Sequence, residues 1–141
     1  MSQKRLIDTL EEVMAYLAKL KYALMDSHCQ IVFQESRKVD ENRNPRFTNI
    51  FTISDLAPNQ KPTDFIRKEL AKLTVEDYQC SVLDTRYPKR KPMYVFAKEY
   101  KADNVYIKIR VELLEKVNSN VFVMSFHYSD QVIGKDSFPY K

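Results

Sequence analysis

The side chains best suited to chemistry lie near the C-terminal end, in a strand-like run over residues 104–113. Alternation sends Tyr106, Lys108 and Arg110 to one face of this run, and its valine, isoleucine and leucine side chains to the other. A phenol and two cations on one face suit an anionic ligand, because lysine and arginine bind phosphate through charge-assisted hydrogen bonds. The polar face of this run is therefore the first candidate site.

A second strand-like run, residues 120–128, contains one of the two histidines of the chain. Alternation divides it into Val123, Ser125 and His127 on one face and Phe122, Met124 and Phe126 on the other. If the two runs pair in one sheet, their apolar faces must coincide, because a slip of one residue would bury the charges. We therefore expect His127 to lie beside Tyr106 and Lys108.

These residue types could cut an RNA phosphodiester. His127, with an unperturbed pKa near 6.5, suits a proton-transfer role. Lys108 and Arg110 could hold the phosphate, and Tyr106 could orient the attacking hydroxyl or stack on a base. The alternative is an ordinary solvated strand face, because many such faces carry lysine and arginine and a single histidine at a strand end is commonly a surface residue.

A basic loop bounded by prolines, residues 85–92, adds further positive charge. Its cations are Arg86, Lys89, Arg90 and Lys91. We expect this loop and Lys98 to contribute to RNA binding, with a solvated surface or a protein-binding patch as the alternative. The net charge of +4 and the pI near 9.0 favour acidic partners only modestly.

Several classes of site lack their signatures in this sequence. His28 and Cys29 have no clustered partners for a zinc site, and the single glycine, Gly134, excludes a glycine-rich phosphate loop. No nucleophile elbow accompanies the two histidines. We therefore expect no metal and no cofactor.

Two cysteines make no disulfide framework, which favours a reducing cytosol. The first residues lack the apolar core of a secretory signal, and no apolar run approaches transmembrane length. A cytoplasmic protein is the expectation.

The rest of the chain predicts the elements that position this site. Thr9 and Glu12 form a capping box that begins a long amphipathic helix. Its predicted core-facing stripe is Leu10, Val13, Met14, Leu17, Leu20 and Leu24. A strand is expected over 28–36, a polar loop over 37–49, a helix over 64–73 capped by Thr63, and a short helical turn from Thr74.

Strands are predicted over 93–100, 104–113 and 120–128, joined by the short connections 102–104 and 118–120. Short connections favour an antiparallel meander. We predict one α+β domain over residues 1–141, in which a small antiparallel sheet combines this meander with the N-terminal strand. Helices would pack on one face and leave the other free for a ligand.

Four blocks in order resemble the MqsR-like toxins of bacterial type II toxin–antitoxin systems, within the RelE-like group of mRNA interferases. The blocks are Leu73–Tyr78, Met93–Glu99, Val105–Ile109 and Val123–His127. The resemblance implies a helix-backed antiparallel sheet, metal-independent mRNA cleavage, and a cognate antitoxin as partner, with the ribosome as a further candidate. It places family site positions on Tyr106, Lys108 and His127.

The chain departs from the family pattern at three places. No lysine follows Asp77 and Tyr78, the stretch 94–96 is apolar where a glutamine is expected, and Ala97 stands in place of a glycine. Two alternatives to a toxin stay open. One is a non-catalytic RNA- or protein-binding module, and the other is a structural partner-binding protein that uses the basic loop.

Overall fold

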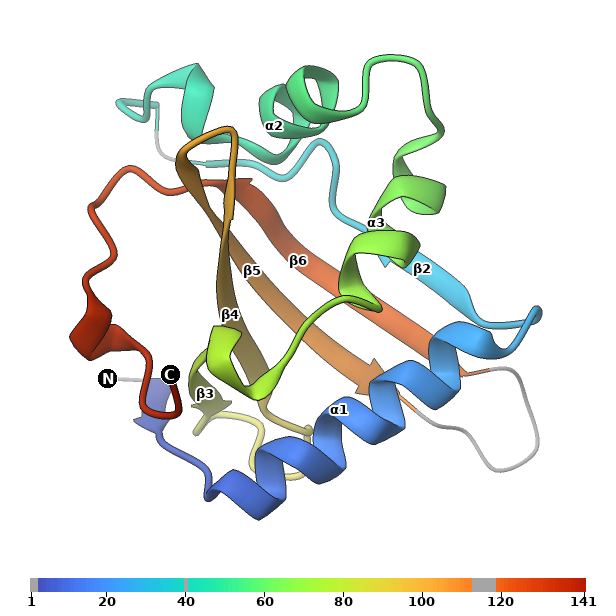
Figure 1. The fold of residues 1–141 in the computed structure, drawn as a ribbon, viewed down its shortest axis with the longest axis vertical. Helices are drawn as coiled ribbons and strands as arrows, with labels where there is room; N and C mark the ends of the chain where they lie inside the picture. Colours follow the sequence, from blue (N-terminus) through green and yellow to red (C-terminus); the bar gives the residue numbers. More distant parts are fainter. Residues whose placement is uncertain (1–2, 40, 113–118) are drawn as a thin grey trace.

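The computed structural model describes residues 3–39, 41–112 and 119–141, which form an α+β fold (Figure 1). Its α-helices are α1 (Leu10–Met25), α2 (Asn49–Leu56) and α3 (Pro62–Leu70). Its strands are β1 (Gln3–Leu6), β2 (Gln30–Phe33), β3 (Tyr78–Asp84), β4 (Met93–Tyr100), β5 (Asp103–Glu112) and β6 (Asn120–Tyr128). Leu113 and Asn118, placed by prediction in a strand and a turn, lie outside the described residues.

The strands form a six-stranded mixed sheet in the order β1-β3-β4-β5-β6-β2. The predicted meander is present as β4, β5 and β6, and β3 and β1 continue the antiparallel pairing on one side. The predicted N-terminal strand is present as β2, which pairs in parallel with β6 at the opposite edge. The sheet is therefore larger than predicted, since neither β1 nor β3 was expected, and it is not purely antiparallel.

Helix α1 begins at the predicted capping box. The Glu12 amide donates to Thr9 Oγ1 (3.1 Å), and the Thr9 amide donates to Glu12 Oε1 (2.9 Å). Most of the predicted stripe is buried, but Leu10 and Met14 are 38% and 55% exposed, so their assignment to the core was wrong. At about 100° per residue, Leu10 and Met14 lie to one side of the buried stripe formed by the other four residues.

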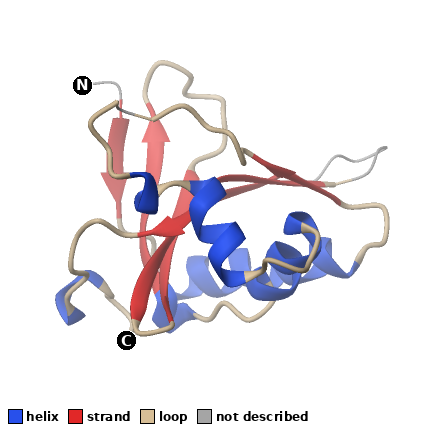
Figure 2. Ribbon diagram, turned by 90° about the horizontal axis from the view of Figure 1, so that it is seen from above, coloured by secondary structure: helices blue, strands red, loops and turns tan. Residues whose placement is uncertain are grey.

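The helices cover one side of the sheet, as Figure 2 shows from above. Four side chains of β5 are fully or almost fully buried on this side: Val105, Ile107, Ile109 and Val111. They belong to one continuous core with Leu17 and Leu20 of α1, Ile66 and Leu70 of α3, and Phe96 and Phe126 of the sheet. The alternate residues of β5 point to the side that the helices leave uncovered.

A β-bulge in β6 changes the predicted faces of that strand. Ile107 of β5 lies opposite Phe126, but Ile109 lies opposite Val123, so one extra β6 residue, Met124, is accommodated between the pairs. The β6 residues that precede the bulge therefore face the opposite side of the sheet from the one that simple alternation predicts. Val123 is buried on the core side, and Phe122, opposite Arg110, moves to the polar face, which corrects both assignments.

Ser125 and His127 keep the predicted face, because both follow the bulge. Ser125 lies opposite Lys108, and His127 lies opposite Tyr106. Among the described helices, none combines the length and the apolar character that crossing a bilayer requires.

Candidate functional site

Helix α2 holds the part of β6 that carries Ser125 and His127. Strand β2 pairs with β6 only as far as Val123, so the next backbone groups of β6 need other partners. Asn49, at the start of α2, supplies them: its Nδ2 donates to the Met124 carbonyl (3.0 Å), and its Oδ1 accepts from the Phe126 amide (2.9 Å). A side-chain amide thus replaces a neighbouring strand beside the bulge.

Asn49 and Thr52 make two further contacts, one at the end of β2 and one at the end of β6. Asn49 Nδ2 also donates to the Gln34 carbonyl at the end of β2 (2.7 Å), and the Tyr128 amide donates to Thr52 Oγ1 (2.8 Å). Asn49 and Thr52 are 4% and 0% exposed. We call these contacts of Asn49 and Thr52 the α2 clamp, and it fixes the backbone on both sides of His127.

An open cavity of about 900 Å³ lies on the uncovered face of the sheet. Strands β1, β3, β4, β5 and β6 contribute to its lining, together with the β2–α2 connection and the C-terminal segment after β6. Tyr140 anchors that C-terminal segment, because its hydroxyl donates to the Asp8 carbonyl and its ring stacks against Tyr78. Residues distant in sequence therefore meet around one concave surface.

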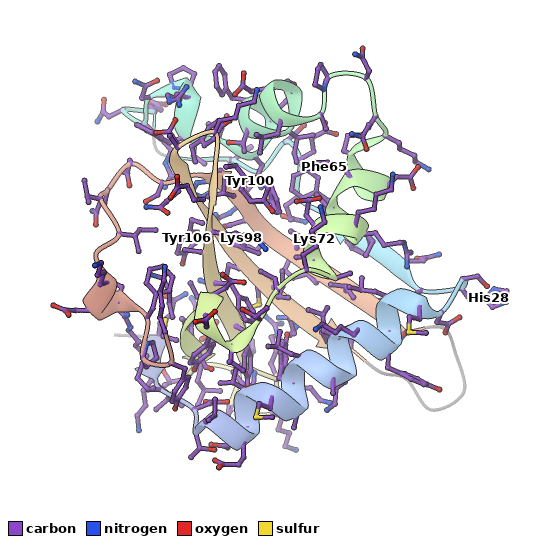
Figure 3. All side chains as sticks on the ribbon, in the orientation of Figure 1. His28, Phe65, Lys72, Lys98, Tyr100 and Tyr106 are labelled. Carbon is purple, nitrogen blue, oxygen red and sulfur yellow. The ribbon has the colours of Figure 1, made fainter. Side chains whose placement is uncertain are left out.

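The three predicted catalytic residues all line this cavity. The rings of Tyr106 and His127 stack with a centroid separation of 5.5 Å and an interplanar angle of 30°. Lys108 is adjacent to Tyr106 along the same face of β5 and lies opposite Ser125, whose hydroxyl accepts from Arg37 Nη1 (3.3 Å). Figure 3 shows Tyr106 at the left of the crossing strands β4 and β5.

A single hydrogen bond determines the tautomer of the His127 ring. Its Nδ1 lies 2.9 Å from the Tyr128 carbonyl oxygen, which can only accept, so Nδ1 carries the hydrogen. The neutral imidazole then has an unprotonated Nε2. Burial has the largest effect and lowers the pKa of His127, and the hydrogen bond to Tyr128 opposes it. The positive charges of Arg43 and Arg37 lower this pKa further, and Asp130 raises it slightly. A neutral ring at pH 7 is a suitable proton acceptor.

The same environment shifts the pKa values of Lys108 and Tyr106. Burial, assisted by the charge of Arg37, lowers the pKa of Lys108, so its ammonium is a stronger acid than a lysine in water. Burial raises the pKa of the Tyr106 phenol, which therefore keeps its proton at neutral pH. The site thus combines a proton acceptor, a proton donor and a neutral phenol.

The cavity carries excess positive charge. Arg5, Arg37, Arg43 and Lys108 line it, against one carboxylate, Asp130. Among the residues that the structure describes, none of these four cations forms an ion pair with a carboxylate. An anionic ligand would supply the missing countercharge.

The two predicted RNA-binding residues that belong to strands, Arg110 of β5 and Lys98 of β4, lie outside this cavity. Arg110 shares the sheet face of Lys108, but its Nε donates to Glu112 (2.8 Å) and its guanidinium lies 5.0 Å from the Phe122 ring centroid. Lys98 points to the opposite, helix-covered face, where its amine donates to the Lys72 carbonyl (3.4 Å; Figure 3). Lys98 therefore does not share the polar face of Tyr106 and Lys108, and RNA contact by Lys98 stays a prediction.

The predicted basic loop connects β3 to β4 and does not line the cavity. Arg86 is bound to Asp84 through Nε (3.2 Å) and Nη2 (3.1 Å), and Arg90 lies 4.6 Å from the ring centroid of Tyr87. Lys89 and Lys91 are exposed. RNA contact by this loop stays a prediction.

Sequence reasoning missed Arg5, Arg37 and Arg43 as site residues. Arg5 reaches the cavity through the pairing of β1 with β3, and the two others through the parallel pairing of β2 with β6. Both pairings join segments far apart in the chain. The only local signal was the density of arginines in the polar connection after β2.

Within the described ranges, histidine, cysteine, aspartate and glutamate side chains do not gather in the groups of three that a metal site requires. Comparisons with protein-family models, curated proteins and solved structures found no match. The likeness to MqsR-like toxins therefore stays a prediction, and the chemistry of the cavity is the stronger guide to function.

Proposed function

We propose that this protein is a ribonuclease toxin that cuts mRNA through attack of the 2′-hydroxyl on the adjacent phosphate. One observation carries the proposal: a cavity with four cations and one carboxylate contains a neutral histidine stacked on Tyr106, beside a lysine of lowered pKa. These are the groups that phosphodiester cleavage needs, a base, an acid and fixed positive charge.

Each group has a role in a balanced reaction. His127 Nε2 accepts the proton of the 2′-hydroxyl as the bond from that oxygen to phosphorus forms. Arg37 and Lys108 stabilise the negative charge of the pentavalent phosphorane. As the bond from phosphorus to the 5′-oxygen breaks, Lys108 protonates that oxygen, which leaves a 2′,3′-cyclic phosphate and a 5′-hydroxyl. Tyr106 holds the imidazole through ring stacking and can orient the attacking hydroxyl.

The cellular setting is part of the proposal. Both cysteines are free and buried, which suits a reducing cytosol. A cognate antitoxin would neutralise the protein, either by covering the cavity or by binding elsewhere and preventing access to the ribosome.

Purified protein, free of any antitoxin, tests the proposal. We expect it to cut single-stranded RNA and to leave 2′,3′-cyclic phosphate ends, detectable by mass spectrometry of the fragments. RNA in which every 2′-hydroxyl is methylated should resist cleavage, because the attacking group is missing. Absence of cleavage both with and without ribosomes, together with normal growth on expression, would refute the proposal.

The pH dependence of cleavage has a defined direction. His127 acts in its neutral form, so kcat/KM should rise with pH on an acid limb centred below 6.5, the ordinary histidine pKa. Lys108 acts in its protonated form, so the rate should fall on an alkaline limb centred below 10.5, the ordinary lysine pKa. Initial rates on one RNA substrate across this range measure both limbs. An acid limb above pH 6.5 would contradict the assignment of His127.

Binding without cleavage is the second candidate. The cations of the cavity come from separate segments, and their charge does not depend on His127. A module of this kind would bind RNA with an affinity that falls steeply with salt, but would release no fragments.

A further inference from the structure

The three arginines of the cavity come from its two opposite ends. Arg5 belongs to the edge strand β1, whereas Arg37 and Arg43 belong to the β2–α2 connection beyond β6. Strands β3, β4 and β5 lie between β1 and β6. With neighbouring strands about 4.8 Å apart, the β1 and β6 backbones are roughly 19 Å apart along the sheet. A phosphate bound at one end leaves the arginine at the other end unused.

The charges of the two ends overlap in the middle of the cavity, where Arg37 and Arg5 both act against the burial that raises the pKa of the Tyr106 phenol. Arg5 and Lys108 both act on the Cys80 thiol, whose pKa is raised by burial against their opposing charge. Arg37 and Arg43 both act on His127. Lys108 belongs to both regions, because Arg37 also lowers the pKa of its ammonium. The positive charge therefore extends across the cavity, and Lys108 lies between the two ends.

In the part of the chain that the structure describes, the residues that line the cavity between these ends carry no negative charge. Cys80, Val95, Lys108 and Ser125 lie opposite one another in a row across four strands. Val82, opposite Arg5, continues this surface to β1. The carboxylate of the lining, Asp130, follows β6 and acts on His127. A polyanion could cross the sheet here without meeting a negative side chain.

We propose that the cavity holds two phosphate subsites, one at Arg37, Arg43 and His127, where cleavage occurs, and a second at Arg5, so that an RNA strand lies across the sheet from β6 to β1. This inference rests on the proposed function and extends it. It assigns to Arg5 a role in RNA binding that is separate from cleavage. A longer oligonucleotide should therefore bind more tightly than a dinucleotide.

Binding of uncleavable RNA tests the second subsite. The probes are fully 2′-O-methylated, fluorescently labelled RNAs, a dinucleotide with one phosphodiester and a tetranucleotide with three, measured by anisotropy at several salt concentrations. We expect the wild type to bind the tetranucleotide at least tenfold more tightly. Arg5→Gln should remove most of this difference and reduce the slope of log K against log salt by about 0.7, the value for one phosphate contact on a single strand.

Dinucleotide affinity should change less than twofold in Arg5→Gln, because its phosphate occupies the other subsite. Lys21→Gln, on the exposed face of α1, is a matched control that should leave both affinities and the slope unchanged. With natural RNA, Arg5→Gln should raise KM and leave kcat within twofold.

The possible failures are distinct. If the wild type cuts RNA but Arg5→Gln binds the tetranucleotide with unchanged affinity and slope, the second subsite is wrong and the proposed function stands. If the wild type binds neither probe and cuts no RNA, the proposed function fails, and the second subsite fails with it.

Discussion

Replacing His127 with glutamine should lower the rate of RNA cleavage by about 10²–10⁴-fold, the usual contribution of a general acid–base group. The glutamine amide can still donate a hydrogen bond to the Tyr128 carbonyl, but it cannot accept the proton of the 2′-hydroxyl. RNA affinity should change little, because the cations of the cavity remain. Single-turnover cleavage and anisotropy with uncleavable RNA measure the two effects separately.

The chain offers a matched control for this substitution. His28, the other histidine, is exposed in the turn after α1 and lies far from Tyr106 in Figure 3. His28→Gln should cleave at the wild-type rate. The pH profile of the residual activity of H127Q should also lack the acid limb, because that limb reports the titration of His127. Wild-type activity in H127Q would reject His127 as the proton acceptor and would favour a module that binds RNA by charge alone.

Asn49→Ala should reduce the free energy of unfolding by about 2–4 kcal/mol. The substitution removes three hydrogen bonds and leaves the Gln34 and Met124 carbonyls and the Phe126 amide without their partner. Each buried polar group left unsatisfied costs about 1–3 kcal/mol, and partial access of water limits the sum. Urea denaturation followed by circular dichroism measures the change.

Asn59→Ala is the control, since Asn59 is exposed in the connection between α2 and α3, and its effect should lie within about 0.5 kcal/mol. Asn49→Asp gives a second comparison. It keeps the acceptor for the Phe126 amide but loses both donations to carbonyls, so it should also destabilise the fold. Equal stability of N49A and the wild type would show that the α2 clamp contributes nothing.

Strand β5 was predictable because only one of its faces is fully buried. Residues 105–111 of β5 alternate between buried and partly exposed positions, which is the pattern that alternation in the sequence reports. Strand β3 gives no such signal, since Tyr78, Gln79, Cys80 and Ser81 are all buried. Strand β1 is four residues long and mostly exposed, so no apolar period marks it.

The candidate site was predictable to the extent that it is local. Tyr106, Lys108 and His127 come from adjacent strands joined by a short connection, and alternation places all three on one face. Alternation misplaced Phe122 and Val123, because one extra residue at Met124 reverses the count and no residue type marks a bulge. The positions of Arg5 and Arg37 could not be predicted, because they depend on the pairing of β1 with β3 and of β2 with β6. Local sequence patterns do not specify such distant pairings.

Helix α2 also has a protective role. An uncovered strand presents free amide and carbonyl groups that can recruit a strand from another molecule, which is a common route to aggregation. In β6 these groups are those of Met124, Phe126 and Tyr128, and side chains of α2 already bind them. The strand that carries His127 is therefore closed to intermolecular pairing along this stretch, although β2 is too short to cover it.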